Sequence, residues 1–153
     1  MTRTRRSART AGTRFERLIA DYLALHVDDR VDRRPKNGNK DRGDIGGLRL
    51  SPALRSGRLV AECKDTAVTS LGPWQREAEV ERGNDDAVAA VVISKRVGRG
   101  APGEQWVHCT VDDLIALLTG ERPGAPVESS LPTFNEHVAD PADLIAQLIP
   151  QEQ

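Results

Sequence analysis

The sequence is poor in the residues that make covalent cross-links or bind transition metals. Its 153 residues include two cysteines, Cys63 and Cys109, and three scattered histidines. Two cysteines this far apart outline neither a disulfide framework nor a zinc motif, so a reducing, cytoplasmic setting is expected. No apolar run approaches the roughly 18 residues that a transmembrane helix needs. The basic segment 1–10 is followed by no apolar signal region, so we expect neither secretion nor a membrane partner.

The net charge of −1 conceals an uneven distribution of charge along the chain. Residues 1–43 hold 12 Arg and Lys against 6 Asp and Glu, a balance of +6, and the remainder holds 10 against 17, a balance of −7. A basic first part is an electrostatic footprint for a polyanion, most simply a nucleic acid. For residues 1–11 the alternative is a solvated, flexible arginine-rich tail, and we expect a tail there. The basic segment 33–42 differs, because it leads directly into an acidic turn.

The order of the predicted elements is typical of one α/β domain over residues 12–120. Apolar residues at helical spacing predict a helix over 12–26, in which Thr13 and Glu16 match a capping box. The continuous apolar run within 87–96 is typical of a central strand that is covered on both faces. The other predicted elements are strands at 29–34, 44–50, 57–64 and 105–110, and helices at 72–83 and 110–120.

Turn and capping residues mark the ends of the later elements. Pro73 lies near the first position of the helix at 72–83, and Gly83 is placed just past its end. Thr110 and Asp113 are placed as a cap at the start of the helix at 110–120, and Gly120 is placed as its stop. Residues 121–139 are rich in Pro, Gly and Ser and are expected to be a linker, followed by a helix over 140–153.

The strand "RLVAECK" carries two charges on one face. Side chains alternate along a strand, so Cys63 points into the core while Glu62 and Lys64 point together to the other side, roughly 6–7 Å apart. If 44–50 and 57–64 form a hairpin, Asp44 is brought next to this pair. Two carboxylates beside a lysine suit Mg²⁺, which takes one or two carboxylates and fills its other positions with water and phosphate oxygens. The alternative is a solvent-facing strand edge with a weak ion pair.

The residues "GDI…VAECK" resemble the core signature of the PD-(D/E)XK nuclease superfamily, with Asp44, Glu62 and Lys64 at the motif positions and Gly43 in place of its proline. The resemblance covers residues 12–119. It implies a restriction-endonuclease-like core, in which a central mixed β-sheet is flanked by helices. It also implies that Glu16, from the preceding helix, joins the metal site, although a capping role explains Glu16 equally well. The backbone carbonyl of Cys63 is implied as a further metal ligand.

Within that superfamily the chain is most similar to the small Holliday junction resolvases of archaeal and phage type. That similarity implies a homodimeric, Mg²⁺-dependent DNA endonuclease, with Mn²⁺ as a substitute, which acts on branched DNA in a bacterial or phage-infected cell. The alternatives are a repair or restriction-type nuclease on duplex or single-stranded DNA, and a DNA-binding protein of nuclease fold that does not cut.

Further residues are predicted to contact DNA. A basic group before the acidic turn is expected to bind backbone phosphates without sequence preference. Lys95 and Arg96 close the apolar strand, where they either grip a phosphate or only solubilise the strand end. Gln75 is a candidate because the superfamily often places a polar residue there. The basic group consists of Arg33, Arg34, Lys36, Lys40 and Arg42.

Overall fold

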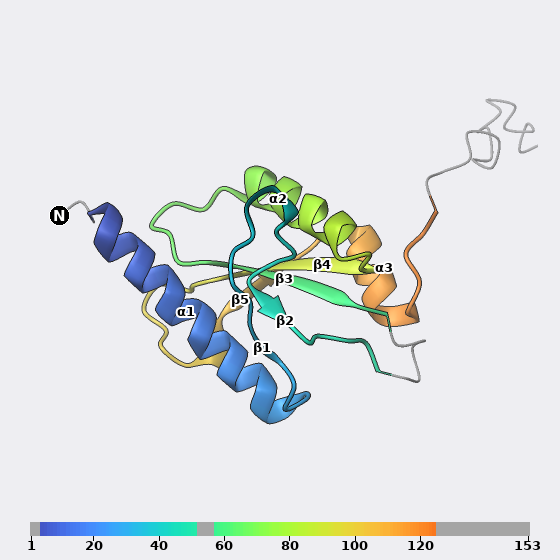
Figure 1. Ribbon diagram of the computed structural model, residues 1–153, viewed down its shortest axis with the longest axis horizontal. Coiled ribbons are helices and arrows are strands. Elements are labelled where there is room, and N and C mark those ends of the chain that lie inside the picture. The colour runs from blue at the N-terminus through green and yellow to red at the C-terminus, as the bar shows by residue number, and fades with distance from the viewer. Residues whose placement is uncertain (1–3, 52–56, 125–153) are drawn as a thin grey trace, which may run out of the picture. The chain divides into compact units, whose positions relative to one another are not determined.

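The computed structural model describes residues 4–51 and 57–124. They form a five-stranded mixed sheet with helices on both faces (Figure 1). The strands lie in the order β1-β2-β3-β4-β5. Neighbouring strands are antiparallel except β3 and β4, which are parallel. The strands are β1 (Asp32–Arg33), β2 (Ile45–Gly46), β3 (Leu59–Lys64), β4 (Ala89–Ser94) and β5 (Trp106–His108).

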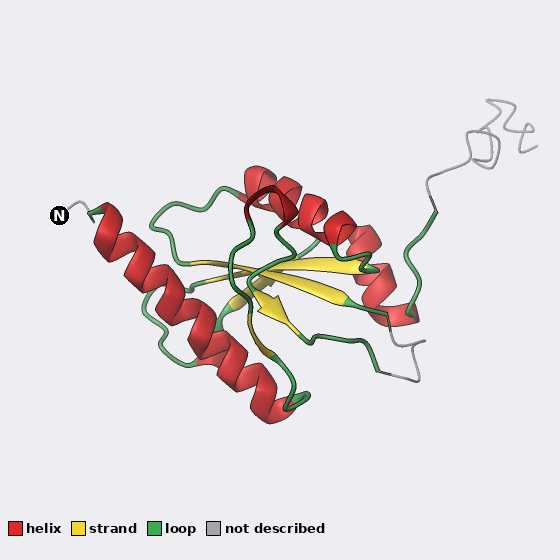
Figure 2. Cartoon of the chain, in the orientation of Figure 1, coloured by secondary structure: helices red, strands yellow, loops and turns green. Residues whose placement is uncertain are grey.

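The helices occupy the two faces of this sheet (Figure 2). They are α1 (Arg5–His26), α2 (Leu71–Asn84) and α3 (Val111–Thr119), with short 3₁₀ turns η1 (Gly38–Lys40) and η3 (Pro102–Glu104). Helix α2 connects β3 to β4, because two parallel neighbours require a crossover. The predicted α/β architecture, a mixed sheet flanked by helices, is confirmed.

Alternation along β3 divides the core into two parts. Ala61 and Cys63 pack with Phe15 and Ile19 of α1, and Val60 packs with Trp74 of α2. The predicted parity of this strand is therefore confirmed, and it places Glu62 and Lys64 on the α2 side. All six residues of β4 are buried, as the apolar run predicts.

Helix α1 begins at Arg5, earlier than the sequence predicts. Thr4 is its N-cap, and its side chain accepts a hydrogen bond from the backbone N–H of Ser7. The prediction of a flexible tail is wrong for residues 5–11, because Ala and Arg are strong helix formers and extend the helix toward the N-terminus. Thr13 lies inside the helix, so the predicted capping box of Thr13 and Glu16 is also wrong.

The ends of the later helices test the remaining capping predictions. The capping box of Thr110 and Asp113 is confirmed, and α3 stops at Gly120, whose φ of 83° favours glycine. Helix α2 starts at Leu71 and runs through Gly83, so Pro73 is its third residue and Gly83 does not end it.

Some predicted features fall outside the described residues. They include the loop at 52–56, most of the linker and the helix at 140–153. Across residues 4–51 and 57–124, no helix is long and apolar enough to cross a membrane.

Candidate active site

Asp44 and Glu62 are brought together where β2 pairs with β3. Ile45 lies opposite Ala61, and the Asp44 backbone N–H donates to the Ala61 carbonyl at 3.0 Å. The Cys63 backbone N–H donates to Asp44 Oδ2 at 2.9 Å, which fixes the carboxylate beside the strand. Asp44 is 3% exposed and Glu62 is 2% exposed. The pairing of β2 with β3 therefore places two buried carboxylates together, Asp44 just before β2 and Glu62 within β3, as the sequence predicts.

Lys64 lies at the end of β3 between two glutamates. Its Nζ donates to Glu62 Oε1 at 2.7 Å and to Glu77 Oε2 of α2 at 2.5 Å. Burial lowers the pKa of Lys64, but the hydrogen bonds to Glu62 and Glu77 raise it by more, so the pKa lies above its ordinary value. Lys64 is therefore an ammonium at neutral pH and acts as a donor, not as a base.

The surroundings of Glu62 disfavour a negative charge. Burial, followed by the charges of Asp44 and Glu81, raises the pKa of Glu62 to about 9, although Lys64 acts in the opposite direction. A carboxylate in this position is costly unless a cation compensates it.

Helix α2 adds two carboxylates that the sequence analysis missed, Glu77 and Glu81. Oxygen atoms of Glu62, Glu77 and Glu81 all lie within 4.8 Å of one another. Burial and the charge of Glu77 raise the pKa of Glu81 to about 7. A signal for Glu81 exists, because it follows Trp74 and Ala78 at helical spacing and so belongs to the buried stripe of α2.

Glu16 is buried on α1, and its Oε2 accepts a hydrogen bond from Arg33 Nε at 2.5 Å. The ammonium of Lys36 lies 3.4 Å from Asp44 Oδ1. Burial lowers the pKa of Lys36, but the charges of Asp44, Glu62 and Glu16 together raise it by more. The Lys36 ammonium thus lies beside Asp44 and within reach of the charges of the other two carboxylates that the sequence assigns to a metal.

Cys63 is a core residue, as its strand parity predicts. Its side chain is buried, and burial together with the charges of Asp44 and Glu62 raises the pKa of the thiol far above its ordinary value. The sulfur is therefore no thiolate ligand at neutral pH. What the structure assigns to Cys63 is the N–H that holds Asp44.

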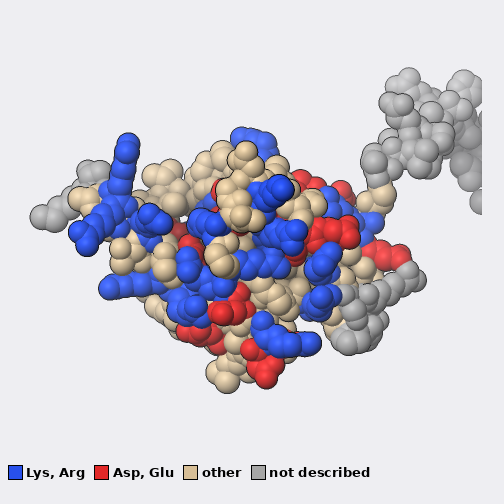
Figure 3. All heavy atoms as spheres, in the orientation of Figure 1, with Lys and Arg blue, Asp and Glu red and all other residues tan. Residues whose placement is uncertain are grey.

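The basic segment 33–42 divides into half-buried and exposed members. Arg33 bonds to Glu16, and Arg34 donates to Asp85 at 3.1 Å and to the carbonyl of Arg42 at 2.5 Å, so both arginines serve the fold. The predicted contact of Arg33 and Arg34 with DNA phosphates stays a prediction, and in this structure both side chains are already paired with carboxylates. Lys36, Lys40 and Arg42 are exposed. Figure 3 shows Lys and Arg gathered over the middle of this face, where the segment between β1 and β2 passes, and over the start of α1.

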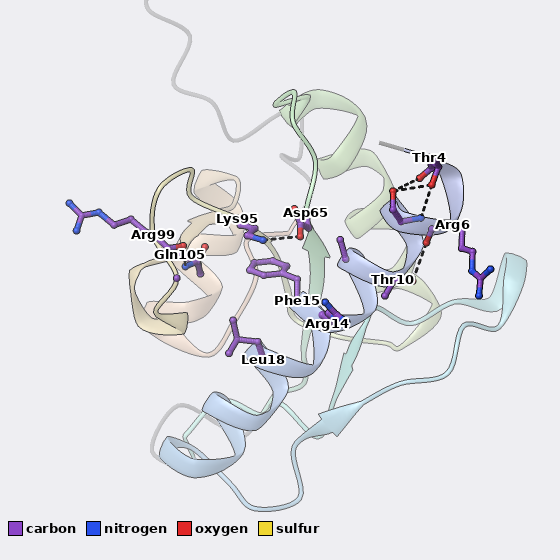
Figure 4. A pocket seen from close by; sticks show the side chains of 13 residues that line it. Thr4, Arg6, Thr10, Arg14, Phe15, Leu18, Asp65, Lys95, Arg99 and Gln105 are labelled. Carbon is purple, nitrogen blue, oxygen red and sulfur yellow. Dashed lines mark hydrogen bonds and ion pairs between the residues drawn. The ribbon is translucent and has the colours of Figure 1, made fainter. Parts of the chain in front are cut away.

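A hollow of about 650 Å³ lies between the first turns of α1 and the loop after β4. In Figure 4, Phe15 and Leu18 form part of its apolar wall, and the ion pair of Lys95 with Asp65, at 3.0 Å, lies beside them. Arg96 is stacked 4.5 Å from the ring centre of Trp106. The basic residues that line the hollow are Arg6, Arg14, Lys95 and Arg99.

Gln75 is not brought to the carboxylates. Its Nε2 donates to Asp113 Oδ2 of α3 at 3.2 Å, because its position on α2 faces α3. The structure does bring Asp44, Glu62 and Lys64 into one cluster and adds Lys36 to it.

Comparisons with protein-family models, curated proteins and solved structures found no match for this chain.

Proposed function

We propose that the protein is a metal-dependent DNA endonuclease that hydrolyses phosphodiester bonds. One observation carries the proposal: the pairing of β2 with β3 brings Asp44 and Glu62 together in a buried cluster, with the ammonium of Lys36 beside Asp44 and that of Lys64 bonded to Glu62. A buried carboxylate with a raised pKa beside a fixed ammonium group, as Glu62 lies beside Lys64, is typical of functional sites.

The donor atoms fit Mg²⁺, or Mn²⁺ in its place. Carboxylate oxygens are the ligands such hard cations prefer. Asp44 Oδ2 is held by the Cys63 N–H while Oδ1 faces the Lys36 ammonium, so one oxygen already has a positive partner. Asp44 and Glu62 would hold the cation, with Glu16 beside them. When bound, such a cation polarises a phosphate and lowers the pKa of a bound water.

The remaining residues position groups and offset charge. Lys64 is fixed by Glu62 and Glu77, so its ammonium can donate to the attacking water or to a phosphate oxygen. Arg33 holds the Glu16 carboxylate in place. Lys36 is exposed for most of its length, so it can leave Asp44 and contact a phosphate when another cation takes its place.

The approach for DNA is the basic surface over the segment between β1 and β2. Lys36, Lys40 and Arg42 are exposed there, with Lys36 beside Asp44, and the hollow with Lys95 extends the positive lining along α1. Contacts of this kind give affinity that is independent of sequence and falls with salt. The expectation of branched DNA comes from the resemblance to the junction resolvases.

The test is cleavage of labelled four-way junctions, Y-forks, linear duplex and single strands of matched sequence, in Mg²⁺ and in Mn²⁺. The wild type is expected to cut, and Asp44→Asn to lose at least about a hundredfold of the rate while still binding DNA. Asp112→Asn, an exposed residue of α3, is the matched control and should cut normally.

The panel also separates the alternatives. Paired symmetrical nicks in the junction alone support a resolvase, and cutting of every substrate supports a nuclease without preference for branched DNA. Tight binding with no cutting in either metal contradicts the enzyme and leaves a DNA-binding protein.

A further inference from the structure

The α2 side of Glu62 contains a buried carboxylate with no donor. Glu81 is 5% exposed, and no hydrogen-bond donor reaches its Oε2. Within residues 4–51 and 57–124, this is the one buried side-chain nitrogen or oxygen atom without a partner. Buried polar atoms are nearly always satisfied, and an exception needs an explanation such as an ion that binds there.

The carboxylates around Glu81 also outnumber the positive groups that are bonded to them. The carboxylates of Glu62, Glu77 and Glu81 lie within 4.8 Å of one another, and the positive group bonded within the cluster is Lys64. When all three carboxylates are ionised, three negative charges against the one positive charge of Lys64 leave two, which is the charge that one divalent cation would balance. Carboxylate oxygens at this separation are close enough to share such an ion.

The cluster is open to solvent on one side. A hollow of about 290 Å³ between η1 and α2 is lined by Glu77, Glu81 and the carboxylate-bearing Asp41. Asn84 Nδ2 donates to the Asp41 carbonyl at 2.7 Å and so ties the η1 loop to α2. The hollow can admit a cation with part of its hydration shell, and its walls carry the same sign of charge.

We propose that Glu62, Glu77 and Glu81 form a second divalent-cation site, for an oxygen-seeking ion such as Mg²⁺, Mn²⁺ or Ca²⁺. The site shares Glu62 with the proposed catalytic site but uses the α2 carboxylates instead of Asp44. It does not depend on nuclease activity, because the unpartnered Glu81 oxygen and the excess charge are present whatever the protein does.

The test is Mn²⁺ binding by the full chain, measured by calorimetry and by electron paramagnetic resonance. Asp44→Asn removes a ligand of the catalytic site and is expected to keep Mn²⁺ bound at the α2 site. Adding Glu81→Gln, or in a second variant Glu77→Gln, should weaken that binding by at least about tenfold, the lower limit for loss of a supporting group around a metal. Adding Glu79→Gln instead is the matched control, since Glu79 pairs with Arg82 and Arg122.

Two results would overturn the second site. One is that Asp44→Asn binds no Mn²⁺, and the other is that the doubly substituted Asp44→Asn, Glu81→Gln protein binds it as tightly as Asp44→Asn alone. Neither result depends on DNA cleavage, so failure of this site and failure of the nuclease proposal are separate outcomes. Circular dichroism of each variant confirms that the fold is retained.

Discussion

Asp113 and Glu81 are both buried carboxylates, but they differ in how many hydrogen-bond donors the protein supplies to them. Asp113 is fully buried and accepts hydrogen bonds from Gln75, Ala90, Arg122 and both the backbone and side chain of Thr110. Glu81 is almost as buried, yet its Oε2 accepts none. Helix α2 touches both places, since Gln75 faces α3 and Glu81 faces the candidate active site.

The electrostatics follow from this difference in donors. Burial raises the pKa of Asp113, but hydrogen bonds from Thr110, Ala90 and Arg122 lower it by more, so its pKa lies below the ordinary value. The pKa of Glu81 is raised to about 7. A carboxylate whose donors are all supplied by the protein serves the fold, whereas one left without donors can serve a ligand.

Asp113→Ala should have the largest effect on stability. It leaves the buried N–H of Ala90 without its acceptor and leaves the partly exposed Arg122 with Glu79 alone, and breaking such a network costs about 3–5 kcal/mol. Urea unfolding in EDTA measures the loss. Asp112→Ala, an exposed neighbour, should change stability by less than about 0.5 kcal/mol. A small loss for Asp113→Ala would mean that the network contributes little.

Glu62, in the candidate active site, and Asp113, beside α3, should make the free energy of unfolding depend on pH in opposite directions. Glu62 keeps a proton in the folded protein up to a pKa of about 9 but loses it near 4.5 when unfolded. Its contribution is therefore full below pH 4.5 and is lost as the pH rises toward 9, at about 1.4 kcal/mol per pH unit for one proton. Asp113 contributes in the opposite sense, because its lowered pKa gives stability above pH 3.8 that is lost in acid.

Unfolding in EDTA from pH 5 to 9 measures the first of these effects. Stability should decline across this range, and Glu62→Gln should flatten the decline. A decline of equal slope in Glu62→Gln would assign it to other groups.

Glu81→Gln should stabilise the metal-free protein at pH 8. It removes a buried charge without a donor while keeping the shape, so a gain of about 1–2 kcal/mol is expected. The gain should shrink in Mg²⁺, which compensates the wild-type carboxylate. Glu79→Gln on the same helix should instead lose a little stability, since it gives up its pairs with Arg82 and Arg122. Destabilisation by Glu81→Gln would show that an unseen partner satisfies the carboxylate.

Thr110→Ala is expected to have the smallest of these effects, about 1 kcal/mol, because it removes the N-cap of α3 and one donor to Asp113. Thr13→Ala is the matched control: its sequence context suggests a cap, but it lies inside α1. Thermal unfolding of both variants checks the difference. Equal losses would contradict the position of the cap at Thr4.

Features of the fold that depend on neighbouring residues alone could be predicted from the sequence. The parity of β3, the burial of β4 and the cap of α3 follow from side-chain alternation, a continuous apolar run and a capping box. The hairpin then brought Asp44 to Glu62. The start of α1 was missed because Thr13 gives the local signal of a cap while the helix-forming residues before it extend the helix to Thr4.

The remainder of the site depends on contacts between distant segments. Pairing of Arg33 with Glu16, of Arg34 with Asp85 and of Gln75 with Asp113 is decided by how the helices pack on the sheet, and charge patterns do not encode it. Glu81 differs from these residues. Its burial could have been predicted from the sequence, because it lies at helical spacing from the apolar residues of α2 that face the core.

The most direct test of the account compares the thermal unfolding midpoint at pH 8 in EDTA and in saturating Mg²⁺, for the wild type and for Glu62→Gln. The central claim is that the uncompensated negative charge around Glu62 is there for a cation. Mg²⁺ at a hundred times its dissociation constant adds about 2.7 kcal/mol, so the wild-type midpoint should rise by about 5 °C or more. Glu62→Gln should start from a higher midpoint and gain almost nothing. An equal rise in both proteins, or none in the wild type, would contradict the claim.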